Sequence, residues 1–357
     1  MSPSPQPDDG VRGSQAGAAA HFGRALLEPF GFALSECELL QSAENDTFRV
    51  MLRSSDRNIA DDSGFLLRIH GYQTAESVDE ECEWLEYVRA VTPVRVPEPY
   101  RLFSDGWAGV VGVAGPRAGR AFSLLRWVPG TAMDGSRPNG AEFRRLGELT
   151  ARLHVAARSW PSAKLAGRPT WDAAGLFLGV NGFGCIDSAG WKAIPSHCDR
   201  QFRWTVRYLT QLLEGLRGSP DAMGLIHGDM HFGNAIDMED SLAIIDFDDC
   251  GTGFLVYDIA SSLRPWRFDI DWPTLKSVYC RGYESVCELP IGIELLDAFI
   301  VARHLATTLW AASRCETCPA LAQTLPARLA ATANAIAALL PVDTTIEAPS
   351  GSEVAGL

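Results

Sequence analysis

The chain has 357 residues, which is too long for one compact core and suits two lobes or domains. Hydrophobic residues make up 46% and charged residues 21%, so most of the chain should fold into ordinary globular structure. The 31 Lys and Arg against 44 Asp and Glu give a net charge of −13, which argues against a nucleic-acid partner. An acidic surface is compatible with a cationic substrate, but solubility alone also explains it.

Both ends of the chain have the composition of disordered tails. Residues 1–20 are mostly Pro, Ser, Gly and Ala, without the basic start and apolar core of a signal peptide, and residues 342–357 also have the character of a tail. No run approaches the roughly 18 apolar residues that a membrane span needs. Nine scattered cysteines indicate reduced thiols, and the lone Cys315/Cys318 pair lacks the second pair of ligands that structural zinc requires. We therefore expect a cytoplasmic protein with no membrane partner.

Between the tails, the pattern of the chain changes near residue 130. Before that point, short β-rich segments separated by polar turns predict strands at residues 47–52, 64–69, 107–113 and 122–127. One helix is expected among them, at residues 76–89, where apolar residues recur at helical spacing.

After Pro129-Gly130 the apolar spacing becomes helical. Helices are expected at residues 141–157, 202–216, 272–287, 293–312 and 321–340, with two short strands at 224–226 and 241–246. We therefore predict an α+β fold with two lobes. The small β-rich N-lobe with one helix would span residues 21–128, and the larger, mainly helical C-lobe residues 129–341.

The two short C-lobe strands each lead into a polar motif. The first motif is His227-Gly228-Asp229-Met230-His231-Phe232-Gly233-Asn234, and the second is Ile245-Asp246-Phe247-Asp248-Asp249. Asp229 can accept a proton from an attacking hydroxyl, while Asn234 and Asp246 offer the hard oxygen ligands that Mg²⁺ prefers. The spacing from Asp229 to Asn234 equals that of the kinase catalytic loop, and a strand-borne Asp follows as metal ligand. This ordered set predicts phosphoryl-transfer machinery.

These motifs resemble those of the aminoglycoside phosphotransferase and choline kinase family, which shares the bilobal protein-kinase-like fold. The pattern is most similar to the branch of homoserine-kinase-like and bacterial stress-response kinases. Further matches are Leu66-Leu67-Arg68-Ile69-His70, Glu81-Cys82-Glu83-Trp84-Leu85, Leu125-Arg126-Trp127-Val128-Pro129-Gly130 and Tyr257-Asp258-Ile259-Ala260. The resemblance implies a phosphotransferase that uses ATP and Mg²⁺ and acts on an alcohol group.

The acceptor is expected to be a small molecule, such as an antibiotic, an amino alcohol, a homoserine-like compound or a sugar. Eleven residues separate Asp246 from Asp258, which is too short for the usual platform that binds a protein substrate. A protein Ser/Thr kinase of the stress-response type and a catalytically inactive nucleotide-binding module remain alternatives. The oligomeric state stays open.

Two departures from the kinase pattern concern the N-lobe. The hairpin at residues 42–50 has no glycine, which leaves phosphate contacts to backbone N–H groups and to polar side chains such as Asn45. All three lysines lie in the second lobe, so Arg68, on an apolar strand, must hold the nucleotide phosphates if any cation does. Glu81 is its expected ion-pair partner. The plainer alternatives are a solvent-facing Arg68 and an ordinary surface acid at Glu81.

The resemblance also implies supporting roles outside the two motifs. The last N-lobe strand, which includes Leu125 and Trp127, would give the adenine its backbone hydrogen bonds. Asp258 would accept hydrogen bonds from the catalytic-loop backbone, with helix capping as the alternative. His227 is expected to orient the loop, because it has no metal partner set. The roles of Asp248 and of the aromatic segment at residues 160–191 stay open.

Overall fold

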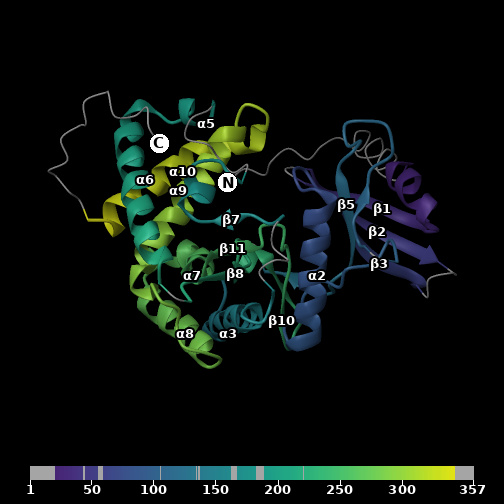
Figure 1. Ribbon diagram of the computed structural model, residues 1–357, viewed down its shortest axis with the longest axis horizontal. Coiled ribbons are helices and arrows are strands. Elements are labelled where there is room, and N and C mark those ends of the chain that lie inside the picture. Colours follow the sequence, from purple (N-terminus) through teal and green to yellow (C-terminus); the bar gives the residue numbers. More distant parts are fainter. Residues whose placement is uncertain are drawn as a thin grey trace.

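The computed structural model describes residues 21–341 except 43–44, 55–58, 105, 134, 136, 162–166, 182–188 and 220. The tails expected at residues 1–20 and 342–357 lie outside the described residues. Within the described part, a β-sheet lobe precedes a larger helical lobe, which confirms the predicted α+β class (Figure 1). The limits expected for the two lobes stay a prediction.

The N-lobe is built on a five-stranded antiparallel sheet in the order β1-β2-β3-β5-β4. Its strands are β1 (Ala33–Ser42), β2 (Asp46–Ser54), β3 (Ile59–Ile69), β4 (Gly109–Val110) and β5 (Ala121–Arg126). Phe48 and Val50 of β2 and Phe65 and Leu67 of β3 are buried, because alternate side chains of a strand point to the same face. Side chains around the 3-10 turn η1 (Glu28–Phe30) complete this core.

Two details of this sheet differ from the sequence-based expectation. β1 was not expected, because most of its side chains are exposed and no alternating apolar pattern marks it. The strand expected at residues 107–113 contracts to β4. Trp107 and Ala108 leave the ladder and donate their N–H groups to the Asp79 carboxylate at 2.7 and 2.8 Å instead.

The helix α2 (Ala75–Val91) stands between the sheet and the helical lobe (Figure 1). Thr74 caps its first turn through its side-chain oxygen. Val78, Cys82 and Leu85 on its apolar face are buried in the same core cluster as the C-lobe helices, and the cluster beneath the sheet does not include them. The same cluster also holds Ala121 and Leu125 of β5, so α2 packs between the sheet and the C-lobe helices.

The C-lobe is mainly helical. Its helices are α3 (Gly140–Ala157), α4 (Ala173–Phe177), α5 (Ala189–Lys192), α6 (Ser196–Arg217), α7 (Leu255–Leu263), α8 (Trp272–Glu284), α9 (Leu296–Arg314) and α10 (Pro319–Leu339). The 3-10 turns η4 (Arg264–Trp266) and η5 (Ile293–Leu295) lie between α7, α8 and α9, and η3 (Phe232–Asn234) lies between two short strands. All five helices expected in this lobe form, with ends displaced by at most six residues.

Two small three-stranded sheets lie in the C-lobe, in the orders β10-β9-β6 and β7-β11-β8. Their strands are β6 (Thr131–Ala132), β7 (Thr170–Trp171), β8 (Met223–Ile226), β9 (Ala235–Asp237), β10 (Leu242–Ile244) and β11 (Gly251–Phe254). β8 and β10 correspond to the two expected strands. The other four have two to four residues each, which is too short to show a periodic signal.

One described segment, Ile293–Arg314, is long and apolar enough to cross a membrane by length and composition alone. The expectation that no such run exists is therefore wrong. However, 72% of its most apolar window is buried inside the protein. Ile300, Val301 and Leu305 of α9 are fully buried among the C-lobe helices, so the packing of a core helix explains the composition.

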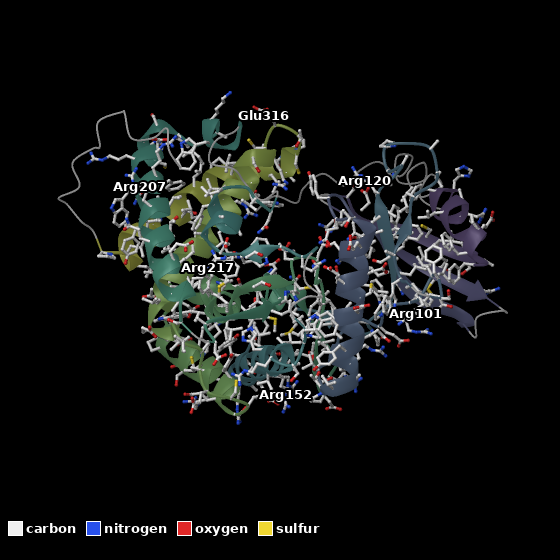
Figure 2. The ribbon with its side chains drawn as sticks, viewed as in Figure 1. Arg101, Arg120, Arg152, Arg207, Arg217 and Glu316 are labelled. Carbon is white, nitrogen blue, oxygen red and sulfur yellow. The ribbon has the colours of Figure 1, made fainter. Side chains whose placement is uncertain are left out.

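Charged side chains are distributed over both lobes. Figure 2 shows Arg101 and Arg120 on the sheet lobe and Arg152 and Arg217 on the helical lobe. Arg152 pairs at 2.7 Å with Glu148, one helical turn earlier, and exposed pairs of this kind add little stability. The arginines labelled in this view therefore do not gather on a single element.

Candidate active site

The loop that follows β8 is held by hydrogen bonds to two buried side chains. The Asp258 carboxylate accepts the N–H groups of His227 and Gly228 at 2.8 and 2.9 Å. The His227 ring donates from Nε2 to the Ile245 carbonyl oxygen at 3.0 Å and accepts the Asp229 N–H at Nδ1 at 3.3 Å. Asp258 lies inside α7, whose cap residue is Phe254, so the helix-capping alternative is wrong.

Gly228 in this loop has no room for a side chain. Its φ of +81° lies in the left-handed region that favours glycine. A Cβ atom there would lie 2.4 Å from the Asp249 carbonyl oxygen and 3.0 Å from Trp171 Nε1. The glycine therefore allows the loop after β8 to approach the loop after β10.

Asp229 forms an ion pair that the sequence did not suggest. Its Oδ1 accepts a hydrogen bond from the Arg303 guanidinium and lies 3.2 Å from His231 Nε2. Arg303, on α9, also donates to the Tyr257 hydroxyl at 3.1 Å. Burial opposes the charge of Asp229, but the Arg303 guanidinium holds the pKa of Asp229 well below its usual range. The carboxylate is therefore ionised at neutral pH.

One feature of the sequence could have indicated that Arg303 is a site residue. Arg303 is a charged residue within the apolar, buried middle of α9, and a buried charge needs a partner. Nothing in the spacing indicates Asp229 as that partner, because 74 residues separate the two.

Asn234 and Asp246 lie on neighbouring segments beside Asp229. The Ile245 N–H donates to the Asn234 carbonyl oxygen at 2.9 Å, which brings the two loops together. The Asn234 amide nitrogen donates to the Asp229 carbonyl oxygen at 3.0 Å, leaving its Oδ1 as the atom that could ligate a metal. Asp246 has a φ of +65°, a conformation that costs energy for a residue with a side chain and that occurs preferentially at functional sites.

The carboxylates at this site outnumber the cations close to them, which suits a bound cation. Burial, reinforced by the neighbouring carboxylates of Asp229 and Asp248, raises the pKa of Asp249 well above its usual value. Within the described residues, no three His, Cys, Asp or Glu side chains are grouped to hold a metal on their own. A Mg²⁺ ion typically takes one or two protein ligands and completes its shell with phosphate oxygens and water. Asn234 and Asp246 fit that requirement.

Asp248 connects the two lobes. It accepts a hydrogen bond from the Asn45 amide nitrogen at 2.8 Å, and it lies 3.0 Å from His70 Nδ1. The Gln73 amide donates to its backbone oxygen at 2.6 Å and to its carboxylate at 3.1 Å. Burial opposes its charge, but the His70 hydrogen bond holds the pKa of Asp248 well below its usual range. Asn45, expected to contact phosphate, has its amide bonded to Asp248 and its Oδ1 to the Gly71 N–H.

Arg68 is buried, so the solvent-facing alternative is wrong. The expected Arg68–Glu81 ion pair is also not formed. Arg68 Nη1 instead lies 2.9 Å from Asp246 Oδ1, while the Glu81 carboxylate lies 3.5 Å from Arg168 Nη1. Burial raises the pKa of Glu81, and the Arg168 charge opposes that rise. Arg168, which the sequence did not single out, takes the place of Arg68 beside Glu81.

The strand expected to contact adenine has its backbone engaged within the N-lobe. Leu125 is buried and paired with Leu66 of β3. The Trp127 N–H donates to the Gly64 carbonyl oxygen at 3.0 Å. Val128 is the first residue after the strand whose N–H makes no hydrogen bond to another described residue. A base bound here would therefore find a backbone N–H donor beyond Trp127.

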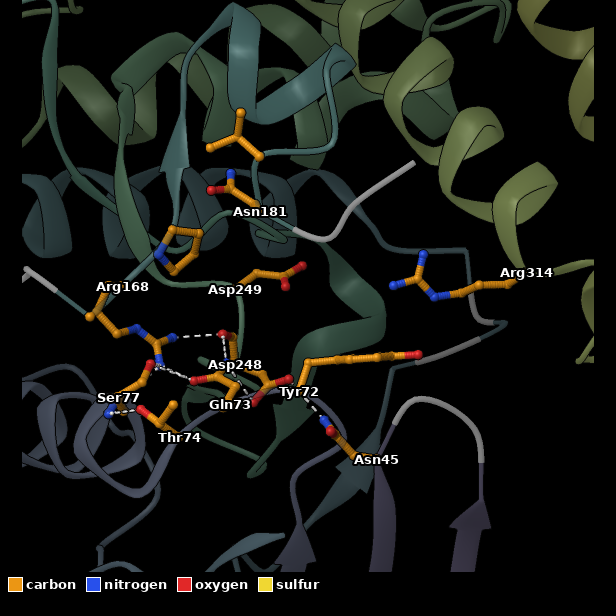
Figure 3. A pocket seen from close by; sticks show the side chains of 13 residues that line it. Asn45, Tyr72, Gln73, Thr74, Ser77, Arg168, Asn181, Asp248, Asp249 and Arg314 are labelled. Carbon is orange, nitrogen blue, oxygen red and sulfur yellow. Dashed lines mark hydrogen bonds between the residues drawn. The ribbon is translucent and has the colours of Figure 1, made fainter. Parts of the chain in front are cut away.

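A cavity of about 350 Å³ opens beside Asp248 and Asp249. Tyr72, Asn181 and Arg314 also line it, and Figure 3 shows these side chains arranged around its opening. The cavity borders the part of the 160–191 segment that the structure describes.

A sequence profile of the "Phosphotransferase enzyme family" matches residues 36–299. Among curated relatives, the amicoumacin kinase of Bacillus subtilis (strain 168) is 26% identical over 77% of this chain and 80% of its own. The homoserine kinase of Brucella abortus (strain S19) is 28% identical over 52% of this chain and 54% of its own. The chain spans less than two thirds of the length of the first curated relatives that it matches.

Solved structures share the fold. A microcompartment-associated aminopropanol kinase superposes with a TM-score of 0.71 at 23% identity, covering 88% of this chain and 95% of its own. An amicoumacin kinase in complex with AMP-PNP, Ca²⁺ and Ami superposes with a TM-score of 0.67 at 20% identity, covering 90% and 96%.

Proposed function

Because this chain belongs to the phosphotransferase enzyme family, we propose that it transfers the γ-phosphoryl group of Mg²⁺-bound ATP to a hydroxyl group of a small molecule. One observation carries the proposal. Asp229 and Asn234 lie on one loop and Asp246 on the next, and the hydrogen bond from the Ile245 N–H to the Asn234 carbonyl oxygen joins the two loops. Phosphoryl transfer needs this combination of an acceptor-orienting acid and hard metal ligands.

Asp229 would hold the acceptor hydroxyl. Arg303 and His231 engage its Oδ1, whereas among the described residues Oδ2 has only a 3.3 Å contact, with the Asn234 amide nitrogen. Oδ2 is therefore the atom with room for the acceptor hydrogen. Because its pKa is low, Asp229 is a weak base, and its main contribution is to orient the hydroxyl for a transfer in which positioning dominates.

Arg68 would contact the phosphates. Its guanidinium already lies beside Asp246, and a planar fork can bind a carboxylate and a phosphate oxygen together. Asn234 Oδ1 and Asp246 would hold Mg²⁺, which when bound neutralises the charge that develops on the phosphoryl oxygens. The use of ATP by this chain is supported by the nucleotide analogue in the related amicoumacin kinase.

A small-molecule acceptor is favoured by the short connection between the two acids. From Asp246 to Asp258, the chain forms one loop, β11 and the start of α7, so it has no extended surface for a protein substrate. The related amicoumacin and aminopropanol kinases are named for small molecules. The identity of the acceptor, the oligomeric state and a cytoplasmic location stay predictions.

Asp229→Asn tests the proposal. Purified protein is incubated with MgATP and a panel of aminoglycosides, amino alcohols, homoserine and sugars, and ADP release is measured. We expect turnover with at least one alcohol, its loss in Asp229→Asn, and MgATP affinity within about threefold of wild type, because Asp229 contacts the acceptor. Asp240→Asn, in an exposed turn, is the control. Near-wild-type turnover in Asp229→Asn would remove Asp229 from the mechanism.

A further inference from the structure

The Arg168 side chain is fully buried beneath the loop that carries Asp246. Its Nη2 donates to the carbonyl oxygens of Phe247 at 2.9 Å and Asp248 at 2.6 Å, and its Nε donates to the Cys250 carbonyl oxygen at 2.8 Å. Three backbone carbonyls that directly follow Asp246 thus point at one guanidinium. A planar cation with five donors can hold three carbonyls in fixed directions, which a single ammonium cannot do.

The other edge of the same guanidinium holds the first two turns of α2. Arg168 Nη1 donates to Gln73 Oε1 at 2.7 Å and to the Ser77 carbonyl oxygen at 3.1 Å, and it lies 3.5 Å from the Glu81 carboxylate. Figure 3 shows Arg168 between Ser77 and Asp248, with the hydrogen bonds drawn to both sides. The buried Arg168 side chain therefore joins α2 to the loop that carries Asp246, the candidate metal ligand.

This arrangement divides a task that protein kinases give to one ion pair. In those enzymes, a lysine on the third strand contacts the phosphates and pairs with a helix glutamate, and this ion pair must be in place for activity. Here the third-strand cation, Arg68, turns to Asp246, and Glu81 receives its charge partner from the C-lobe. Val78 and Leu85 of α2 are buried in a core cluster that β5 and the C-lobe helices share.

We propose that Arg168 is a positioning residue that fixes α2 and the 247–250 backbone together, so that Asp246 is presented to the metal. The proposal rests on the proposed function above, because it assumes that Asp246 serves a Mg²⁺-nucleotide. Arg168 contacts neither substrate nor metal. It acts through the carbonyls of the loop and through Glu81, and Arg68 is thereby left available to the phosphates.

The test compares Arg168→Lys with wild type and with Arg267→Lys. Arg267 makes a two-point ion pair with Asp297, at 2.8 and 2.9 Å, and neither residue is one of the site residues described above, so its replacement controls for losing a guanidinium fork. Three quantities are measured: MgATP affinity by calorimetry, the Mg²⁺ dependence of kcat and KM, and amide hydrogen exchange of residues 246–250 without nucleotide.

We expect Arg168→Lys to fold, to bind MgATP about 10–100-fold more weakly and to require correspondingly more Mg²⁺, as is typical when a group that orients a metal ligand is lost. Exchange at residues 246–250 should accelerate in Arg168→Lys and stay unchanged in Arg267→Lys. Wild-type MgATP affinity and wild-type exchange in Arg168→Lys would overturn the proposal.

A second variant covers a folding failure of Arg168→Lys. Gln73→Met removes one acceptor of Arg168 on the α2 side and the Gln73 bonds to Asp248, at a half-buried position. This variant should also weaken MgATP binding, and unchanged affinity would overturn the proposal.

The two proposals can fail separately. A wild-type protein that binds MgATP but phosphorylates no alcohol would refute the proposed function, and MgATP affinity and exchange would still decide the role of Arg168. A wild-type protein that does not bind MgATP would refute both.

Discussion

Gly228→Ala and Gly31→Ala are a matched pair that measures the steric constraint on the loop that follows β8. Both glycines have left-handed backbones, with φ of +81° at Gly228 and +79° at Gly31. An added Cβ meets nothing within 4 Å at Gly31, whereas at Gly228 it would lie 2.4 Å from the Asp249 carbonyl oxygen. The conformational cost is therefore common to both variants, and the clash belongs to Gly228 alone.

The magnitudes follow from these contacts. Holding alanine in the left-handed region costs about 1–2 kcal/mol, which should appear in both variants. Overpacking against a rigid backbone atom adds about 1–3 kcal/mol at Gly228. The expected loss of unfolding free energy is therefore about 1–2 kcal/mol for Gly31→Ala and about 2–5 kcal/mol for Gly228→Ala.

Chemical denaturation measures the stability difference, and ADP release measures the effect on the site. If the loop relieves the clash by moving away from Asp249, Gly228→Ala should also lose turnover, because Asp229 is the next residue. Gly31→Ala should keep its turnover. Equal stability losses in the two variants, with full activity in Gly228→Ala, would refute the reasoning.

Three further predictions concern single side chains of the site. Asp246→Ala should lose Mg²⁺-dependent ATP binding in calorimetry, because its carboxylate links the cation to the protein; unchanged binding would show that the metal assignment is wrong. Arg68→Ala should lower kcat/KM for MgATP about 10–100-fold, since a hydrogen bond to a charged group contributes about 1.5–3 kcal/mol, and Arg68→Lys should recover part of the loss. A fully active Arg68→Ala would mean that backbone and metal alone hold the phosphates. Arg303→Met should raise the pKa of Asp229, because burial remains and the charge partner is lost. The native carboxylate, with its depressed pKa, contributes stability above its unfolded pKa that disappears as pH falls. The acid limb of the kcat/KM profile should therefore move to higher pH in Arg303→Met, and an unmoved limb would contradict the assignment of Asp229.

The sequence by itself determined the two-lobed α+β architecture and the family, and it located the candidate site residues in two motifs. Burial leaves a periodic signal, so the central strands and the long helices could be predicted from apolar spacing. Asp229 and Asn234 are five residues apart on one loop, and Asp246 follows a strand that pairs with the segment after Asn234. Contacts of this kind are local, so the order of the residues is enough to bring them together.

The tertiary structure alone decided which charges pair. Arg68 could reach either of two carboxylates, and the folded structure places Asp246 beside it and Glu81 beside Arg168. Arg303 meets Asp229 across 74 residues. A long guanidinium can reach partners in several directions, and the choice depends on the position and burial of elements distant in the chain. No local spacing encodes that choice.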